Sequence, residues 1–147
     1  MSKPRPESVT LQAGQDLGAF PLVPIAAAWG AAAVGVVSWI GLFFGGLHWL
    51  APLGVGTLVG LAVMFTDKHG DKRLPWAAAG VTLLTCWVAY FIMDHFLITW
   101  IGAPRTIGQS ILAFPRNMSL ALMSLVGAYL AWVVASRAGK STTQGLT

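Results

Sequence analysis

Long runs without a charged residue dominate this chain. No Asp, Glu, Lys or Arg occurs between Leu17 and Thr66, and two further uncharged stretches run from Leu74 to Met93 and from Asn117 to Ser136. About 20 apolar residues in a helix span the hydrocarbon core of a bilayer, whereas a water-soluble fold has no use for uncharged runs of this length. The pattern therefore predicts an all-α multi-pass membrane protein.

The first uncharged run is too long for a single crossing, because at 1.5 Å per residue it would extend for about 75 Å. Gly45 and Gly46 provide a hinge, and Pro52 suits the first turn of the helix that follows. The chain is therefore expected to form four spans arranged as two hairpins. The expected spans cover about residues 22–44, 49–66, 75–101 and 117–136, and together they form a transmembrane domain (22–136) between an N-terminal tail (1–21) and a C-terminal tail (137–147).

The segment from Gly102 to Arg116 separates the third and fourth spans. It contains prolines and glycines and is predicted to be a loop. Within it, Ile107, Ile111 and Phe114 fall on one side of a short helix that would lie on the membrane surface.

Basic residues are divided unevenly between the two sides that this arrangement creates. Because Lys and Arg favour the cytoplasmic side of a membrane, their distribution predicts the orientation of the chain. Both termini and the central loop share the basic side, so both termini are expected in the cytoplasm. This side holds Lys3, Arg5, Lys68, Lys72, Arg73, Arg137 and Lys140, and the other side holds Arg105 and Arg116.

The composition supports the interpretation as a membrane protein and excludes other classes of protein. Charged residues make up 10% of the chain, against about 25% in a typical soluble domain. The net charge of +4 is small and scattered, so no nucleic-acid partner is expected. The single cysteine, Cys86, lies inside a predicted span, so no disulfide framework is expected.

Asp94 and His95 are the strongest candidates for chemistry. At helical rise, Asp94 lies about 9 Å before Trp100, which marks the outer interface of the third span. An ionisable residue inside a membrane is a functional hypothesis, because burying its charge in lipid is costly. The alternative is that the span ends early, with Asp94 among the headgroups and paired with Arg105 or Arg116. Both interpretations stay open at this point.

His48 is a possible partner for this pair, since the outer turn that holds it faces the same side of the membrane. Two imidazoles from different helices can ligate a haem iron or another metal, and Asp94 would add a carboxylate. This hypothesis makes His48, His95 and Asp94 a candidate cofactor site. Haem, quinone or pigment are possible cofactors, although no motif indicates any of them and no specific metal site is predicted.

Small residues spaced four apart indicate close helix packing. Gly56 and Gly60 share one face of the second span, while Gly35 and Gly41 each belong to a similar pair in the first span, with Ala31 and Gly45. Such spacing lets two backbones approach closely in lipid. Packing of the first span against the second is the simplest expectation, and packing against another subunit is the alternative.

No Gly-rich phosphate loop, metalloprotease His pair or Ser-His-Asp set can be assembled, so an enzyme is not expected. The favoured hypothesis is a small accessory or scaffold subunit of a larger membrane complex, such as an energy-transducing one, with lipids, other membrane subunits or bound pigments as partners. The alternatives are a haem- or quinone-binding membrane anchor and a small proton-coupled transporter. The scarcity of polar residues in the spans disfavours the transporter, since a transport path needs them.

The stretch from Leu53 to Val63, with the short basic turn and the apolar helix that follow, resembles small bacterial inner-membrane proteins. These proteins have no assigned function, so the resemblance implies none for this chain. The expected location is the bacterial cytoplasmic (inner) membrane.

Overall fold

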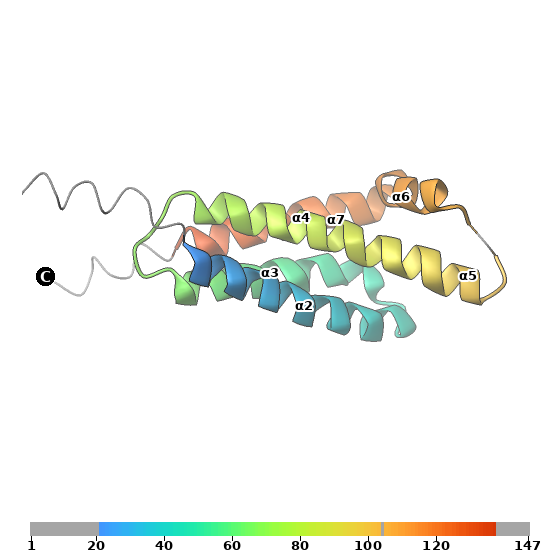
Figure 1. The fold of residues 1–147 in the computed structure, drawn as a ribbon, viewed down its shortest axis with the longest axis horizontal. Helices are drawn as coiled ribbons and strands as arrows, with labels where there is room; N and C mark the ends of the chain where they lie inside the picture. The colour runs from blue at the N-terminus through green and yellow to red at the C-terminus, as the bar shows by residue number, and fades with distance from the viewer. Residues whose placement is uncertain (1–20, 104, 138–147) are drawn as a thin grey trace, which may run out of the picture.

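The computed structural model of the protein describes residues 21–103 and 105–137, and these residues form helices without any strand (Figure 1). Within these described ranges, four helices are long and apolar enough to cross a membrane, which confirms the prediction of an all-α protein with four apolar spans. The predicted tails lie outside the described residues up to residue 20 and from residue 138. The helices are α2 (Leu22–Phe44), the 3₁₀ turn η1 (His48–Leu50) leading into α3 (Ala51–Thr66), α4 (Leu74–Ile92) continued by η2 (Met93–Leu97) and α5 (Ile98–Trp100), the short α6 (Ile107–Arg116), and α7 (Met118–Ala135).

Proline, glycine and aspartate determine where the helices begin and end. Pro52 and Pro75 stand in the first turns of α3 and α4, where the missing N–H removes no helical hydrogen bond. Between these helices, Asp67 Oδ1 accepts hydrogen bonds from the backbone N–H groups of His69 and Gly70, at 3.1 and 2.9 Å. Gly70 has a φ of 69°, which favours glycine, so this turn is encoded locally.

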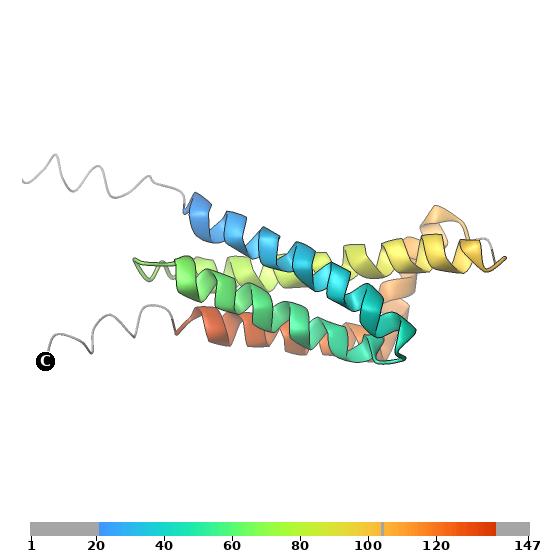
Figure 2. The same cartoon turned by 90° about the horizontal axis from the view of Figure 1, so that it is seen from below.

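The four long helices lie side by side and run the length of the molecule (Figures 1 and 2). The start of α2, the end of α7 and the turn between α3 and α4 lie at one end. The turn between α2 and η1, together with α5 and α6, lies at the opposite end, which we call the α6 end. Helices α3 and α4 each pack against the other three long helices, and the contacts of α3 with α7 and α2 are the most extensive in the bundle.

The contact between α3 and α7 is unusually close. A Cβ atom at Gly56 would overlap the carbonyl of Gly127, and one at Gly127 would overlap the carbonyl of Pro52. One turn further along, a Cβ at Gly60 would lie 2.9 Å from the carbonyl oxygen of Ala131. Only glycine leaves room for these backbones, as in other closely packed membrane helices.

The predicted packing glycines therefore have different surroundings. Gly35 faces α3, where an added Cβ would lie 2.9 Å from Val55 Cγ2. Gly56 and Gly60 face α7, whereas the simplest expectation placed them against the first span. Gly41 is exposed and an added Cβ would meet nothing within 4 Å, so its role in packing against another subunit stays a prediction.

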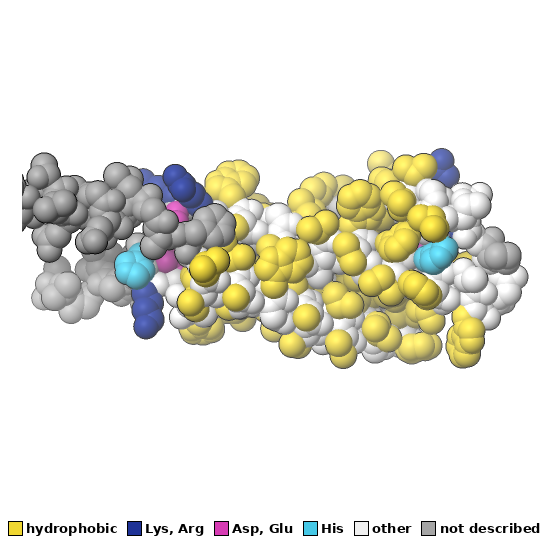
Figure 3. Space-filling view, viewed as in Figure 1, with side chains coloured by type: hydrophobic (Ala, Val, Ile, Leu, Met, Phe, Trp, Pro, Cys, Tyr) yellow, Lys and Arg dark blue, Asp and Glu magenta, His cyan; other side chains and the backbone are white. Residues whose placement is uncertain are grey.

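Most of the surface along the bundle is apolar. Large hydrophobic side chains are exposed along all four long helices. Figure 3 shows one face on which apolar side chains cover the length of the bundle, while Lys, Arg, Asp and His side chains gather toward its ends. This distribution suits a protein surrounded by lipid along its length and by headgroups or water at its ends.

Helix α3 contains its own control for the close contact. Gly56→Ala should lower the stability by about 1–3 kcal/mol, because the new methyl group forces α3 and α7 apart. Gly54→Ala, two residues away and with nothing within 4 Å of its added Cβ, should be neutral or stabilising by up to about 1 kcal/mol, since alanine favours a helix. Thermal unfolding in a mild detergent measures both changes. Equal effects of the two substitutions would contradict the packing described.

Candidate functional site

Asp94 forms a buried ion pair at the α6 end of the bundle. Arg105 Nη1 donates to Asp94 Oδ1 at 2.6 Å, and the side chain of Asp94 is 2% exposed while that of Arg105 is 43% exposed. The second carboxylate oxygen, Oδ2, is also buried and has no hydrogen-bond partner among the described residues. The pairing matches one interpretation from the sequence and the burial matches the other: the carboxylate is paired with Arg105 and still lies inside the protein.

Helical geometry places this ion pair close to a membrane boundary. Asp94 follows Leu74 by about 30 Å at 1.5 Å per residue, and the hydrocarbon core is also about 30 Å thick. If Leu74 lies at one boundary, Asp94 lies near the other. Helix α6 folds back beside α4 at this level (Figure 1). The carboxylate of Asp94 is therefore covered by protein rather than by lipid, whereas the side chain of Arg105 is partly exposed.

The helix changes its winding at the same position. Met93 to Leu97 form a π-helical turn, and Met93 and Asp94 are both buried within it. Single π-helical turns occur frequently at functional sites because they re-aim the side chains that they carry. Nothing in the sequence around Asp94 indicated this turn.

Helix α6 is attached to α4 through several polar and aromatic contacts. Ser110 is fully buried, and its Oγ lies 3.4 Å from Nδ1 of His95. Trp87 Nε1 donates to the carbonyl of Ile111 at 3.2 Å, and the ring of Tyr90 packs against that of Phe114. These contacts, together with the ion pair, hold α6 in place beside α4.

The sequence contains the signal that starts α6. Thr106 and Gln109 form a capping box, in which Thr106 Oγ1 accepts from the Gln109 N–H at 3.3 Å and Gln109 Oε1 accepts from the Thr106 N–H at 3.0 Å. The Thr-x-x-Gln spacing could have predicted a helix from Ile107 onward. By contrast, no sequence signal identified Ser110 as the residue that meets His95.

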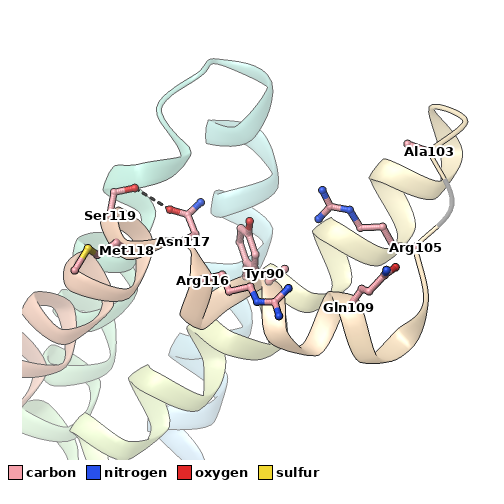
Figure 4. A pocket seen from close by; sticks show the side chains of 9 residues that line it. Tyr90, Ala103, Arg105, Gln109, Arg116, Asn117, Met118 and Ser119 are labelled. Atoms are coloured by element: carbon pink, nitrogen blue, oxygen red, sulfur yellow. Dashed lines mark hydrogen bonds between the residues drawn. The ribbon is translucent and has the colours of Figure 1, made fainter.

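An open pocket of about 890 Å³ lies beside the ion pair, between α4, α6 and the start of α7 (Figure 4). Polar side chains make up most of its wall, and two of them are arginines. The sequence identified Arg105 and Arg116 only as possible partners of Asp94, not as parts of one pocket. The pocket is lined by Tyr90, Ala103, Arg105, Gln109, Ala113, Arg116, Asn117, Met118 and Ser119.

The predicted cofactor residues have separate surroundings. His48 packs against the ring of Phe43, whereas His95 stacks on Phe91 and meets Phe96 edge-on. Within residues 21–103 and 105–137, no three His, Cys, Asp or Glu side chains form a group that suits a metal ion. Asp94 and His95 share one π-helical turn, while His48 belongs to η1 and shares none of these contacts.

Comparisons with protein families, with curated proteins and with solved structures found no match to this chain.

Because Asp94 is buried and Arg105 is partly exposed, replacing Arg105 should destabilise the protein more than replacing Asp94. Arg105→Gln leaves a buried carboxylate without its partner and should lower the stability by about 3 kcal/mol. Asp94→Asn leaves an arginine that water can reach, so the loss should be about 1–2 kcal/mol. The double variant should recover part of the loss caused by Arg105→Gln, because no charge remains buried.

Thermal unfolding of the purified variants in one detergent measures all three effects. An Asp94→Asn protein as unstable as the Arg105→Gln protein, or a double variant with fully additive losses, would show that burial of the carboxylate does not determine its energetics.

Proposed function

We propose that this protein is a small accessory or scaffold subunit of a larger membrane complex. In this role it contributes no catalytic step and contacts partner subunits through the outward face of α2. The proposal rests mainly on the composition of that face.

Helix α2 is the least covered of the four spans. In the most apolar 18-residue segment of α2, 22% of the residues are buried inside the protein, against 33–39% in the corresponding segments of the other three spans. Its inward face packs on the bundle through residues such as Ala28, Gly35 and Trp39. Its opposite face is left open along the whole helix.

That open face carries small side chains where lipid contact alone requires none. Ala26, Gly30, Ala33 and Gly41 are exposed and follow one stripe at helical spacing. Cβ atoms added at Gly30 or Gly41 would meet nothing within 4 Å, so these glycines serve no packing within the described chain. In membranes, small residues are enriched where another helix approaches closely. A transmembrane helix of a partner subunit is therefore the occupant that we propose.

Two of the buried hydroxyl groups, those of Thr82 and Ser124, support a structural role rather than a transport path, whereas Thr85 Oγ1 is buried without a hydrogen-bond partner among the described residues. Thr82 donates to the carbonyl of Ala78 at 2.9 Å, and Ser124 donates to that of Leu120 at 2.8 Å. Groups bonded to their own helix do not form a continuous polar route.

The partner-helix proposal predicts a difference between two glycines. Gly30→Leu should disrupt the assembly with the partner while the isolated protein still folds, because the new side chain projects only into the open face. Gly80→Leu is the matched control, since Gly80 is exposed on α4 and also has nothing within 4 Å of an added Cβ. Native electrophoresis after gentle solubilisation, with mass spectrometry of the isolated band, measures the assembly.

A parent complex that contains only copies of this chain would contradict the accessory-subunit proposal. So would equal assembly of the Gly30→Leu and Gly80→Leu proteins.

The proposed orientation keeps both termini in the cytoplasm of a bacterial cell, as the distribution of Lys and Arg predicts. A cysteine at Gly108 in α6 should then react with a membrane-impermeant reagent added to intact cells, and a cysteine at His69 should not. Both positions are exposed, and the native Cys86 is buried. Labelling at position 69 but not at 108 would reverse the orientation.

A further inference from the structure

The pocket at the α6 end carries excess positive charge. Arg105 and Arg116 both contribute to its wall, and no Asp or Glu is among the lining residues. Asp94 compensates Arg105, but Arg116 forms no ion pair with any residue in the described part of the chain. Figure 4 shows both arginine side chains and Tyr90 around the same open space. One positive charge is therefore left for a ligand.

The neutral side chains of the pocket offer mainly donors. Gln109 Oε1 already accepts a hydrogen bond from the Thr106 N–H, which leaves its amide NH₂ group available. Asn117 Oδ1 likewise accepts from Ser119 Oγ at 2.9 Å and from the Leu120 N–H at 3.4 Å. Its NH₂ group is also available. The local bonds that start α6 and α7 thus occupy the acceptors and leave donors around the pocket.

With Leu74 at the opposite membrane boundary, this pocket lies at the depth of phospholipid headgroups. Asp94, paired with one of the lining arginines, lies about one hydrocarbon thickness from Leu74. Ile107, Ile111 and Leu112 of α6 are exposed, as expected for a helix that lies in the interface. Met118 and Ala113 give the pocket an apolar part beside its charged part.

We propose that this pocket binds a phosphate group, with Arg116 as its main charged contact and the amides of Gln109 and Asn117 as neutral donors. Arginine suits phosphate because its planar guanidinium donates two parallel hydrogen bonds. The phosphate belongs either to the headgroup of an anionic phospholipid or to a soluble phosphate ester. A zwitterionic headgroup is a poorer ligand, because no acidic side chain lines the pocket to meet its cation.

The test uses the full-length protein in a mild detergent. Phosphatidylglycerol, phosphatidylcholine and soluble glycerol phosphate are titrated separately, and the rise in Tm gives the apparent affinity for each. We expect a larger rise with phosphatidylglycerol than with phosphatidylcholine. Arg116→Gln should weaken the phosphatidylglycerol affinity about fivefold, which corresponds to about 1 kcal/mol per basic residue near an anionic surface.

Arg137→Gln is the matched control. It removes the same charge from an exposed position just after the end of α7, whereas the pocket lies at the start of α7, so it should retain the parent affinity. Ala103→Glu is a second variant for the case in which Arg116→Gln does not fold. It places a negative charge on an exposed residue of the pocket and should weaken binding in the same way.

Each outcome decides the proposal. A shift caused by phosphatidylglycerol alone, lost with Arg116→Gln and kept with Arg137→Gln, supports a lipid site. The same Arg116-dependent shift with glycerol phosphate supports the site and identifies a soluble ligand. No shift with any of the three compounds overturns the proposal, as does equal loss in the Arg116 and Arg137 variants. If Arg116→Gln does not fold, an unchanged affinity of Ala103→Glu overturns it as well.

Discussion

The backbone contact between α3 and α7 is the constraint on which the rest of the bundle depends. Gly56 and Gly127 face each other so closely that neither position has room for a Cβ atom. In lipid, helices gain little from the hydrophobic effect when they associate, because the acyl chains are as apolar as the side chains. Close approach is then the main source of attraction, and these glycines permit it. Since α3 also contacts α2 and α4, this contact holds the centre of the molecule.

The position of α7 has consequences for the chain that precedes it. To reach its place against α3 and α4, the chain must return from the far end of α5, and α6 lies on this return path (Figure 2). Its contacts with Trp87, Tyr90 and His95 place it over the end of α4. Helix α6 also contacts η2, which holds the buried Asp94, and the segment that leads into α6 contributes Arg105, which compensates the charge of Asp94. The path of the chain from α5 through α6 to α7 thus determines both the packing of α7 in the bundle and the polar site at the α6 end.

At the α6 end of the bundle, the positive charges outnumber the negative charges. One carboxylate is available there for two arginines, and it is used by Arg105. The capping residues Gln109 and Asn117 use their oxygens locally, so their amide groups face the pocket as donors. Positive charge and unused donors together make this end suited to anions. The open stripe of α2 is a separate surface, apolar and suited to a helix, so the two proposals concern different partners and can fail independently.

Hydropathy alone determined the four apolar helices. A bilayer offers no water to backbone N–H and C=O groups, so long uncharged segments must become helices that satisfy these groups internally. Pro52 and Pro75 also mark the starts of helices, and the Thr106–Gln109 spacing could have predicted the start of α6. The small residues at positions 35, 56 and 60 were recognisable as packing residues, but their partners were not. Tertiary structure alone decided that Gly56 meets α7, that Asp94 is buried and paired, and that residues from α4, the loop before α6, α6 itself and the start of α7 line one pocket. The physical reason is that a span that is apolar on every side has no hydrophobic face to direct toward the core, so its sequence cannot specify which neighbour it packs against.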